Sequence, residues 1–119
     1  MPRNLQSYPK RGEIFVANLN PGFGREVRKK RPVLVISNNT LNQELPTVII
    51  IPFSSIVPKF AGPDVVKIKN PGVGLNKESV LIANQIRSID KSRLIKRVGK
   101  LSQNLFEETK QALKITLDL

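Results

Sequence analysis

Two short apolar runs constrain the fold of this chain more than any other feature of its sequence. Residues 32–37 (PVLVIS) and 47–52 (TVIIIP) are almost continuously apolar and rich in β-branched side chains. Runs of this kind are typical of central strands that are covered on both faces. Because sequential strands are usually neighbours, we expect these two strands to lie side by side in one sheet.

Shorter extended segments flank this central pair. Residues 13–19 combine β-branched and aromatic side chains and end at an Asn-Pro-Gly turn. Residues 65–69 have the pattern of a half-buried strand, and residues 79–82 and 85–89 predict either one long strand or two short ones. The chain therefore contains five or more short strands, joined by turns rich in glycine and proline.

The C-terminal segment changes to helical spacing. Apolar side chains recur on one stripe from Gln103 to residue 117, and Ser102 precedes them as an N-cap. The 119 residues are sized for one domain, 1–119, in which residues 1–9 are an N-terminal extension. We therefore predict a mainly β fold with a C-terminal helix (α+β), arranged as a small, twisted, partly closed antiparallel barrel.

Composition narrows the chemistry that the chain can perform. It has no cysteine and no histidine, which excludes thiolate metal sites and catalysis by either side chain, and we expect neither a metal nor a cofactor. Twenty basic residues against nine acidic ones give a net charge of +11, which predicts attraction to RNA, DNA or an acidic protein. No apolar run approaches the roughly 20 residues of a spanning helix, and the first residues lack a signal peptide, so we expect a cytoplasmic protein that does not bind membranes.

The densest charge run lies just before the first central strand. Five of the seven residues from Arg25 to Arg31 are basic. Taken alone, such a run is more often a solvated loop. Arg31 differs from the rest, because it precedes the proline that begins a buried strand and the scaffold therefore fixes its position. Its planar guanidinium suits bidentate contact with a phosphate.

Hydroxyl side chains appear where the second central strand leaves the core, at Ser54 and Ser55. Serines at strand ends commonly bond only to turn backbone, and that interpretation stays open. In an antiparallel pair the start of one strand lies beside the end of the other, so Arg31 and Ser54 would converge on one phosphate. Further along, Gln85 and Arg87 alternate and are expected to share one face of a strand, with a solvated polar face as the alternative.

Several blocks of sequence, taken in order, carry a family resemblance. They are residues 11–14 (RGEI), Asn20-Pro21 with Gly24 and Glu26, residues 30–38 (KRPVLVISN), Pro46-Thr47 followed by residues 49–54 (IIIPFS), residues 79–81 (SVL) and residues 85–94 (QIRSIDKSRL). In this order they resemble the MazF/PemK toxins of bacterial toxin–antitoxin systems. The resemblance spans nearly the whole chain, from about Lys10 to Leu117.

This resemblance implies an SH3-like barrel of the PemK/CcdB type with a C-terminal helix, acting as a homodimer. It implies a sequence-specific, metal-independent endoribonuclease that cleaves single-stranded RNA by attack of a 2′-hydroxyl, leaving 2′,3′-cyclic phosphate and 5′-hydroxyl ends. The family's catalytic arginine falls on Arg31 and its catalytic threonine falls on Ser54. The serine is a departure, since it keeps the hydroxyl but loses the methyl group that restricts χ1.

Other residues near this pair have expected roles in proton transfer and RNA binding. Arginine, with a pKa above ~12, is a poor base and histidine is absent, so we hypothesise Glu26 as an alternative general base. RNA is bound by cations along the backbone, by hydrogen bonds to base edges and by stacking on aromatic rings. The corresponding residues here are Arg28, Lys29 and Lys30 for the backbone, Gln85 and Arg87 for base edges, and Phe53 or Phe23 for stacking.

The same resemblance implies two partners, single-stranded mRNA and an acidic, MazE-like antitoxin whose disordered tail covers the basic groove. A rival interpretation stays open, namely a non-catalytic barrel of the same fold. Such a barrel is either a CcdB-like gyrase inhibitor or a basic nucleic-acid-binding module. A structural protein that binds RNA without cleaving it is a third interpretation.

Overall fold

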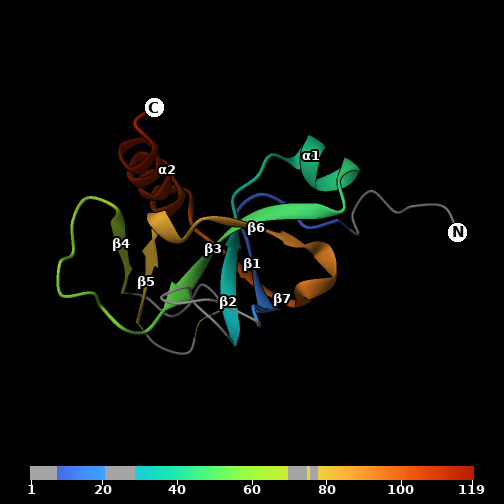
Figure 1. The fold of residues 1–119 in the computed structure, drawn as a ribbon, viewed down its shortest axis with the longest axis horizontal. Helices are drawn as coiled ribbons and strands as arrows, with labels where there is room; N and C mark the ends of the chain where they lie inside the picture. Colours follow the sequence, from blue (N-terminus) through green and yellow to red (C-terminus); the bar gives the residue numbers. More distant parts are fainter. Residues whose placement is uncertain (1–7, 21–28, 70–74, 76–77) are drawn as a thin grey trace, which may run out of the picture.

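Seven strands and two α-helices make up the part of the chain that the structure describes. The structure is a computed structural model and describes residues 8–20, 29–69, 75 and 78–119. Figure 1 shows α2 above β4 and β5 at one side of the molecule and α1 at the other side. In chain order the elements are β1 (Glu13–Asn18), β2 (Lys30–Val35), α1 (Asn39–Glu44), β3 (Thr47–Ser54), β4 (Val65–Ile68), β5 (Ser79–Ile82), the 3-10 helix η3 (Ala83–Gln85), β6 (Arg87–Asp90), the 3-10 helix η4 (Lys91–Arg93), β7 (Leu94–Lys100) and α2 (Gln103–Leu117).

Strand β3 organises the sheet, whose strands follow the order β4-β5-β3-β2-β1-β7 with β6 also paired to β3. One edge of β3 pairs with β2. The other edge pairs first with β6, over Thr47–Ile50, and then with β5, at Phe53 and Ser54. All of these pairings are antiparallel, as the partly closed antiparallel barrel predicts. The end of β3 therefore lies where the two parts of the sheet meet.

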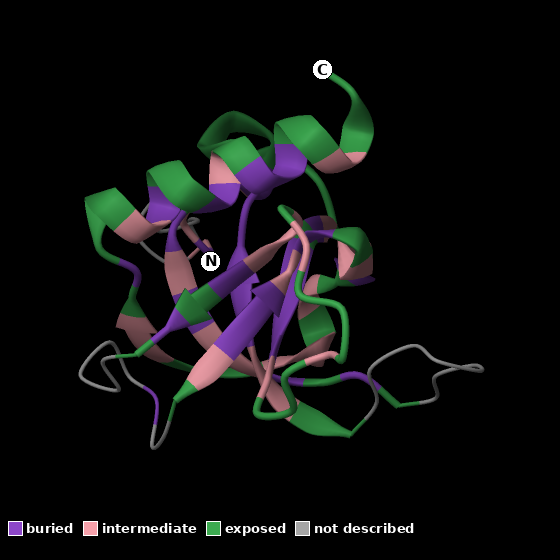
Figure 2. Cartoon of the chain, turned by 90° about the vertical axis from the view of Figure 1, so that its left-hand side faces the viewer, coloured by how far each residue is buried: buried purple, intermediate pink, exposed green. Residues whose placement is uncertain are grey.

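Alternating side chains along β3 enter two apolar clusters, one on each face of the sheet. Ile51 and Phe53 belong to the cluster that α2 covers, to which the helix contributes Phe106. Val48 and Ile50 belong to the second cluster. Figure 2 shows the buried residues of α2 turned towards the sheet and its exposed residues turned outwards. The central strands are thus covered on both faces, as their apolar runs predicted.

Helix α2 spans Gln103–Leu117, which confirms the predicted C-terminal helix. The Ser102 side chain accepts a hydrogen bond from the backbone N–H of Leu105 and so caps the first turn. Asp118 ends the helix in the left-handed conformation, with φ at 56°. Neither this helix nor any other in the described part of the chain is long and apolar enough to cross a bilayer.

A buried polar network ties α1 to β3 and to Ser37, which follows β2. The Ser37 hydroxyl donates to Asn42 Oδ1 and accepts from the backbone N–H of Ile49 at 3.0 Å. Asn42 Nδ2 donates to the Ser37 carbonyl at 2.9 Å. Asn42 is fully buried, at 0% exposure, so these partners replace the water that its amide group would otherwise bind.

Most of the predicted strands are confirmed, and one region is corrected. Residues 79–82 and 87–90 form two short strands, β5 and β6, because η3 interrupts the chain between them. Gln85 lies in η3, so the expectation that it shares a strand face with Arg87 is wrong. The sequence pattern did not predict α1 or β7, and β7 pairs only with β1 within the described residues. Three of its seven residues are basic, which conceals the alternation of an edge strand.

Candidate active site

The antiparallel register of β2 and β3 brings the two predicted catalytic residues to one rim of the sheet. Val33 pairs with Pro52. Continuing this register by two residues sets Arg31 opposite Ser54. Partners directly across an antiparallel pair point to the same face, so the guanidinium and the hydroxyl leave the sheet on one side.

A cavity of about 280 Å³ opens at this rim, and both residues line it. Its described lining includes three cations and three serine hydroxyls, and no carboxylate. This composition favours an anion, because the positive charges attract it and the hydroxyls donate hydrogen bonds to it. The described lining residues are Lys29, Lys30, Arg31, Pro32, Phe53, Ser54, Ser55, Leu75 and Ser79.

The backbone that carries the cations is held by contacts with β1. Arg31 pairs with Ala17 of β1 and is half-buried. Lys29 has a positive φ of 71°, and its N–H donates to Asn20 Oδ1 at 3.0 Å. Its carbonyl accepts from the backbone N–H of Leu19, also at 3.0 Å. The left-handed turn at Lys29 thus directs the chain into β2 just before the cavity.

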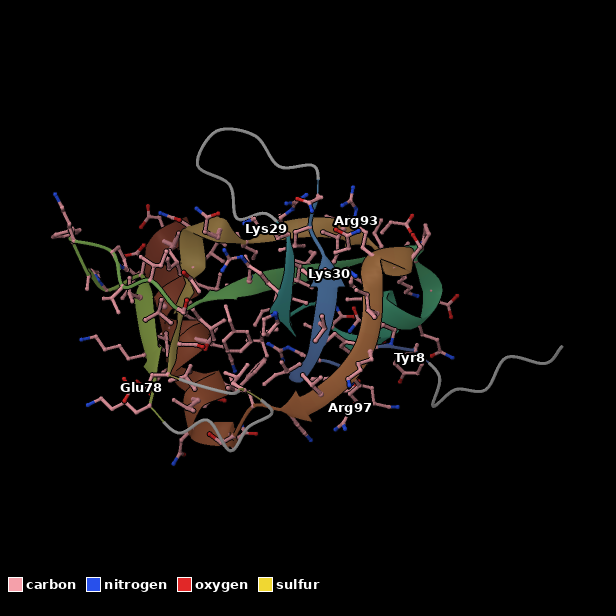
Figure 3. The ribbon with its side chains drawn as sticks, turned by 90° about the horizontal axis from the view of Figure 1, so that it is seen from below. Tyr8, Lys29, Lys30, Glu78, Arg93 and Arg97 are labelled. Carbon is pink, nitrogen blue, oxygen red and sulfur yellow. The ribbon has the colours of Figure 1, made fainter. Side chains whose placement is uncertain are left out.

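Arg93 is a supporting residue that the sequence pattern did not reveal. Its Nη1 atom donates to the carbonyl of Asn18, the last residue of β1, and to that of Asn20, two residues further on. Figure 3 shows Arg93 at the same edge of the molecule as Lys29 and Lys30. Arg93 follows 73 residues after Asn20, so only the fold brings the two together. It fixes the strand end against which Lys29 is held.

Ser54 has two hydrogen bonds within the turn that follows β3. Its hydroxyl accepts from the backbone N–H of Ile56 at 3.1 Å and donates to the Ile56 carbonyl at 3.3 Å. Ser54 therefore does bond to turn backbone, as the alternative interpretation of this serine predicts. The same two bonds hold the oxygen at the cavity that Arg31 lines, so the turn and the cavity both use this hydroxyl.

Phe53 lies in the core rather than on a free surface. The residue is 1% exposed and belongs to the cluster beneath α2, although it contributes to the cavity wall. The expectation that Phe53 stacks on a base is corrected, because a base needs an exposed ring face. The alternation of β3 explains the outcome, since residues 53 and 54 point to opposite faces.

Gln85 and Arg87 are not among the described residues that line this cavity. Arg87 pairs with Ile50, four residues before Ser54 on the same strand. The separation along β3 is about 13 Å, since a strand rises about 3.3 Å per residue. Because Ile50 and Ser54 are an even number of residues apart, Arg87 faces the same side of the sheet as the Arg31 and Ser54 pair.

One guanidinium nitrogen of Arg87 is buried without a hydrogen-bond partner. Among the described residues this Nη1 atom is the buried side-chain polar atom that lacks one. Buried polar atoms in folded proteins are nearly always hydrogen-bonded, so this nitrogen is an exception among the described residues, and because it is buried a base reaches it only if the side chain moves. Glu26, Arg28 and Phe23 lie outside the described residues, and their predicted roles remain predictions.

The described part of the chain contains no group of three or more carboxylate, histidine or cysteine side chains that could hold a metal ion. The groups gathered at the cavity are a guanidinium, two ammonium groups and hydroxyls. Such groups bind a phosphodiester by charge and by hydrogen bonds, and they stabilise charge that develops on its oxygens.

Comparisons with known proteins agree with this chemistry. A family model described as the PemK-like, MazF-like toxin of type II toxin–antitoxin systems matches residues 10–117. Endoribonuclease EndoA of Bacillus subtilis (strain 168) is 36% identical over 110 residues, which cover 92% of this chain and 95% of that protein.

Solved structures share the fold at lower sequence identity. MazF from Deinococcus radiodurans has a TM-score of 0.81 at 24% identity, over 94% of this chain and 98% of that one. A MazE–MazF structure from the same organism has a TM-score of 0.75 at 24% identity, over 94% of this chain and 97% of that one. The toxin MazF-mt6 of Mycobacterium tuberculosis has a TM-score of 0.75 at 23% identity, over 90% and 97% of the respective chains.

Proposed function

This chain belongs to the PemK-like, MazF-like toxins of type II toxin–antitoxin systems, and from that premise we propose that Arg31 and Ser54 carry its endoribonuclease activity. The observation that supports the assignment is their shared cavity, to which adjacent antiparallel strands deliver both side chains. The substrate is single-stranded RNA, whose phosphodiester is the anion that the cations of the cavity attract.

The proposed reaction is a transesterification within the RNA. The 2′-oxygen forms a bond to phosphorus, the bond between phosphorus and the 5′-oxygen breaks, and a 2′,3′-cyclic phosphate and a 5′-hydroxyl result. Arg31 neutralises the charge that accumulates on the phosphoryl oxygens, and Ser54 donates a hydrogen bond to one of them. For this, the Ser54 hydroxyl exchanges its bond to the Ile56 carbonyl for one to the substrate.

Two protons move in this reaction, one from the 2′-hydroxyl and one to the departing 5′-oxygen. Arginine keeps its proton at neutral pH, so it suits the stabilisation of charge better than the removal of a proton. Glu26 remains the proposed base. A pH–rate profile that is the same in Glu26→Gln as in the wild type would exclude that role.

RNA outside the scissile phosphate is bound by residues on both sides of the cavity. We assign the backbone phosphates to Lys29 and Lys30, which line the cavity, and to Arg28 before them. Base edges are assigned to Gln85 and Arg87. Arg87 is half-buried and faces the same side of the sheet as Arg31 and Ser54, which supports its part of this assignment.

An acidic antitoxin is the proposed regulator, and a homodimer is the proposed assembly. The family comprises toxins of toxin–antitoxin systems, and the net charge of +11 suits an acidic partner. A MazE-like antitoxin that covers the cavity would withhold Arg31 from RNA. The proposed substrate, mRNA, sets the proposed place of action in the cytoplasm.

End-group analysis of RNA incubated with the purified protein in EDTA tests the proposal. We expect cyclic-phosphate ends with the wild type and their near-complete loss with Arg31→Ala. Arg97→Ala is the matched control, since that guanidinium lies on β7, pairs with Glu13 and does not line the cavity. Tight binding with no cyclic-phosphate ends would instead support the non-catalytic barrel, and equal cleavage by Arg31→Ala would remove the assignment.

A further inference from the structure

A second cavity adjoins the Arg31 and Ser54 cavity across two shared serines. It has a volume of about 220 Å³, and Ser55 and Ser79 line both cavities. Its other described lining residues are Val57, Lys67, Ile68, Lys69, Glu78 and Val80. An RNA strand that places a phosphate at Ser54 therefore has a neighbouring recess on its path.

Strand pairing sets the distance between the two cavities. Ser54 pairs with Val80 of β5, and Val80 pairs with Lys67 of β4. The three residues thus form a row across neighbouring strands. Strands lie about 4.8 Å apart, so the Cα atoms of Ser54 and Lys67 are about 10 Å apart. A nucleotide whose phosphate lies at Ser54 can therefore place its base in the second cavity.

The two cavities differ in charge. The described lining of the first has cations and no carboxylate, whereas the second contains the carboxylate of Glu78. A carboxylate repels phosphate and accepts hydrogen bonds from amino groups, as acidic side chains do from cytosine N4. Figure 3 shows Glu78 on the β5 side of the molecule, well away from Lys29 and Lys30. The second cavity therefore suits a base better than a phosphate.

The Glu78 carboxylate has neither a hydrogen bond nor an ion pair with the described residues, although Lys67 and Lys69 line the same cavity. Its oxygens are therefore available to an incoming donor. Val57 is 55% exposed and supplies an apolar surface for the face of a base. The two lysines are exposed and can hold the phosphates on either side of that base.

We propose that the second cavity is a base subsite for the nucleotide next to the scissile phosphate, and that Glu78 selects a base with an exocyclic amino group over uracil. This inference rests on the proposed cleavage of RNA at Arg31 and Ser54. Glu78 accepts a hydrogen bond from the amino group. Uracil presents a carbonyl oxygen at the equivalent position, which the carboxylate repels.

Binding of short RNA analogues tests the subsite independently of cleavage. The probes carry a 2′-deoxy sugar at the cleavage position, which prevents attack, and differ only by cytosine or uracil at one position at a time. By fluorescence anisotropy we expect the wild type to prefer cytosine by about 10-fold at one position, the worth of one hydrogen bond to a charged acceptor. Glu78→Gln should abolish this preference, because an amide both donates and accepts.

The control variant is Glu108→Gln, which changes an exposed carboxylate on α2 and should keep the preference for cytosine. Thermal unfolding checks that both variants remain folded. The subsite is refuted if the wild type binds the cytosine and uracil probes equally at every position. It is also refuted if Glu78→Gln keeps the wild-type preference for cytosine.

Mapping of cleavage sites on a long mixed RNA separates the subsite from the proposed function. Arg31-dependent cleavage with an unchanged base profile in Glu78→Gln refutes the subsite and leaves the nuclease assignment intact. A wild type that selects cytosine in the binding assay but does not cleave refutes the nuclease assignment and leaves the subsite intact. Both claims hold if Glu78→Gln still cuts RNA but loses the base preference at one position.

Discussion

The two ends of the β2 and β3 pair both carry polar side chains, but these are buried in the protein at one end and line a cavity at the other. At one end, Ser37 and Asn42 bond to each other and to the backbone of Ile49, and the amide of Asn42 is fully buried. At the other end, Arg31 and Ser54 line a cavity of about 280 Å³. We call these the closed end and the open end.

The comparison shows how this small fold separates stability from reactivity. At the closed end each polar group has a partner within the protein, so its hydrogen bonds stabilise the turn and are unavailable to a ligand. At the open end Arg31 and Ser54 are only half-buried and line a cavity, so a substrate can replace a protein partner such as the Ile56 carbonyl that the Ser54 hydroxyl bonds to. The same two strands carry both ends, and their register, extended by two residues, sets Arg31 opposite Ser54 at the open end.

The largest expected effect at the open end is a loss of activity without a loss of fold. Ser54→Ala should lower kcat/KM for RNA cleavage by about 10²- to 10³-fold, because it removes one donor to the phosphoryl oxygen. The free energy of unfolding should fall by less than about 1 kcal/mol, since the Ser54 hydroxyl bonds only to an exposed turn. Ser88→Ala, which removes an exposed hydroxyl on β6, should leave both quantities unchanged.

The closed end should respond in the opposite way. Asn42→Ala removes a buried amide, so that the Ser37 carbonyl loses the Asn42 donor and the Ser37 hydroxyl loses its acceptor, which should lower the free energy of unfolding by about 1–3 kcal/mol. Urea denaturation measures this change. Cleavage per folded molecule should stay near the wild-type rate. An Asn42→Ala variant with wild-type stability and impaired catalysis would contradict the claim that the closed end serves stability and the open end serves catalysis.

A smaller effect concerns the lysines at the open end. Lys29→Ala and Lys30→Ala should each weaken RNA binding and reduce the slope of log affinity against log salt concentration by about 0.7, because each removes one phosphate contact. Filter binding over a range of salt concentrations measures the slope. Lys114→Ala, which removes an exposed lysine from α2, should leave the slope unaltered. An equal reduction of the slope in Lys114→Ala would show that net charge alone causes the effect.

The smallest effect is an acid dependence at the closed end, where Asp90 pairs with Thr47 at the start of β3. Hydrogen bonds from the backbone and side chain of Ser92, with a smaller contribution from Arg93, lower the pKa of Asp90 below its ordinary value of 3.8. A lowered pKa stabilises the fold above the ordinary value, and the contribution disappears as the pH falls through the folded-state pKa. Asp90→Asn should therefore be slightly less stable than the wild type at neutral pH and equal to it in strong acid. Unfolding curves with the same difference at every pH would contradict this origin.

The sequence predicts the open end well because its signals are local. The apolar runs on either side mark two neighbouring strands, and antiparallel pairing then brings the residue before one strand to the residue after the other. That argument predicts Arg31 and Ser54 at one end of the sheet, and their shared cavity agrees with it.

Features that depend on contacts between distant residues cannot be predicted from local sequence patterns. The buried position of Phe53 depends on α2, which covers that face of the sheet from the far end of the chain. Ser79 reaches the cavity because β5 pairs with the end of β3, and local periodicity does not encode that pairing. Arg93 contacts the end of β1 across 75 residues of sequence, which local periodicity does not encode either.

A double-mutant cycle tests most directly whether Arg31 and Ser54 act on the same phosphodiester. The values of kcat/KM for Arg31→Ala, Ser54→Ala and the double variant would be compared with that of the wild type. Groups that stabilise one transition state together are coupled, so the double variant should lose far less activity than the product of the two single losses. If the two losses multiply, the residues act independently and the shared-phosphate account is wrong.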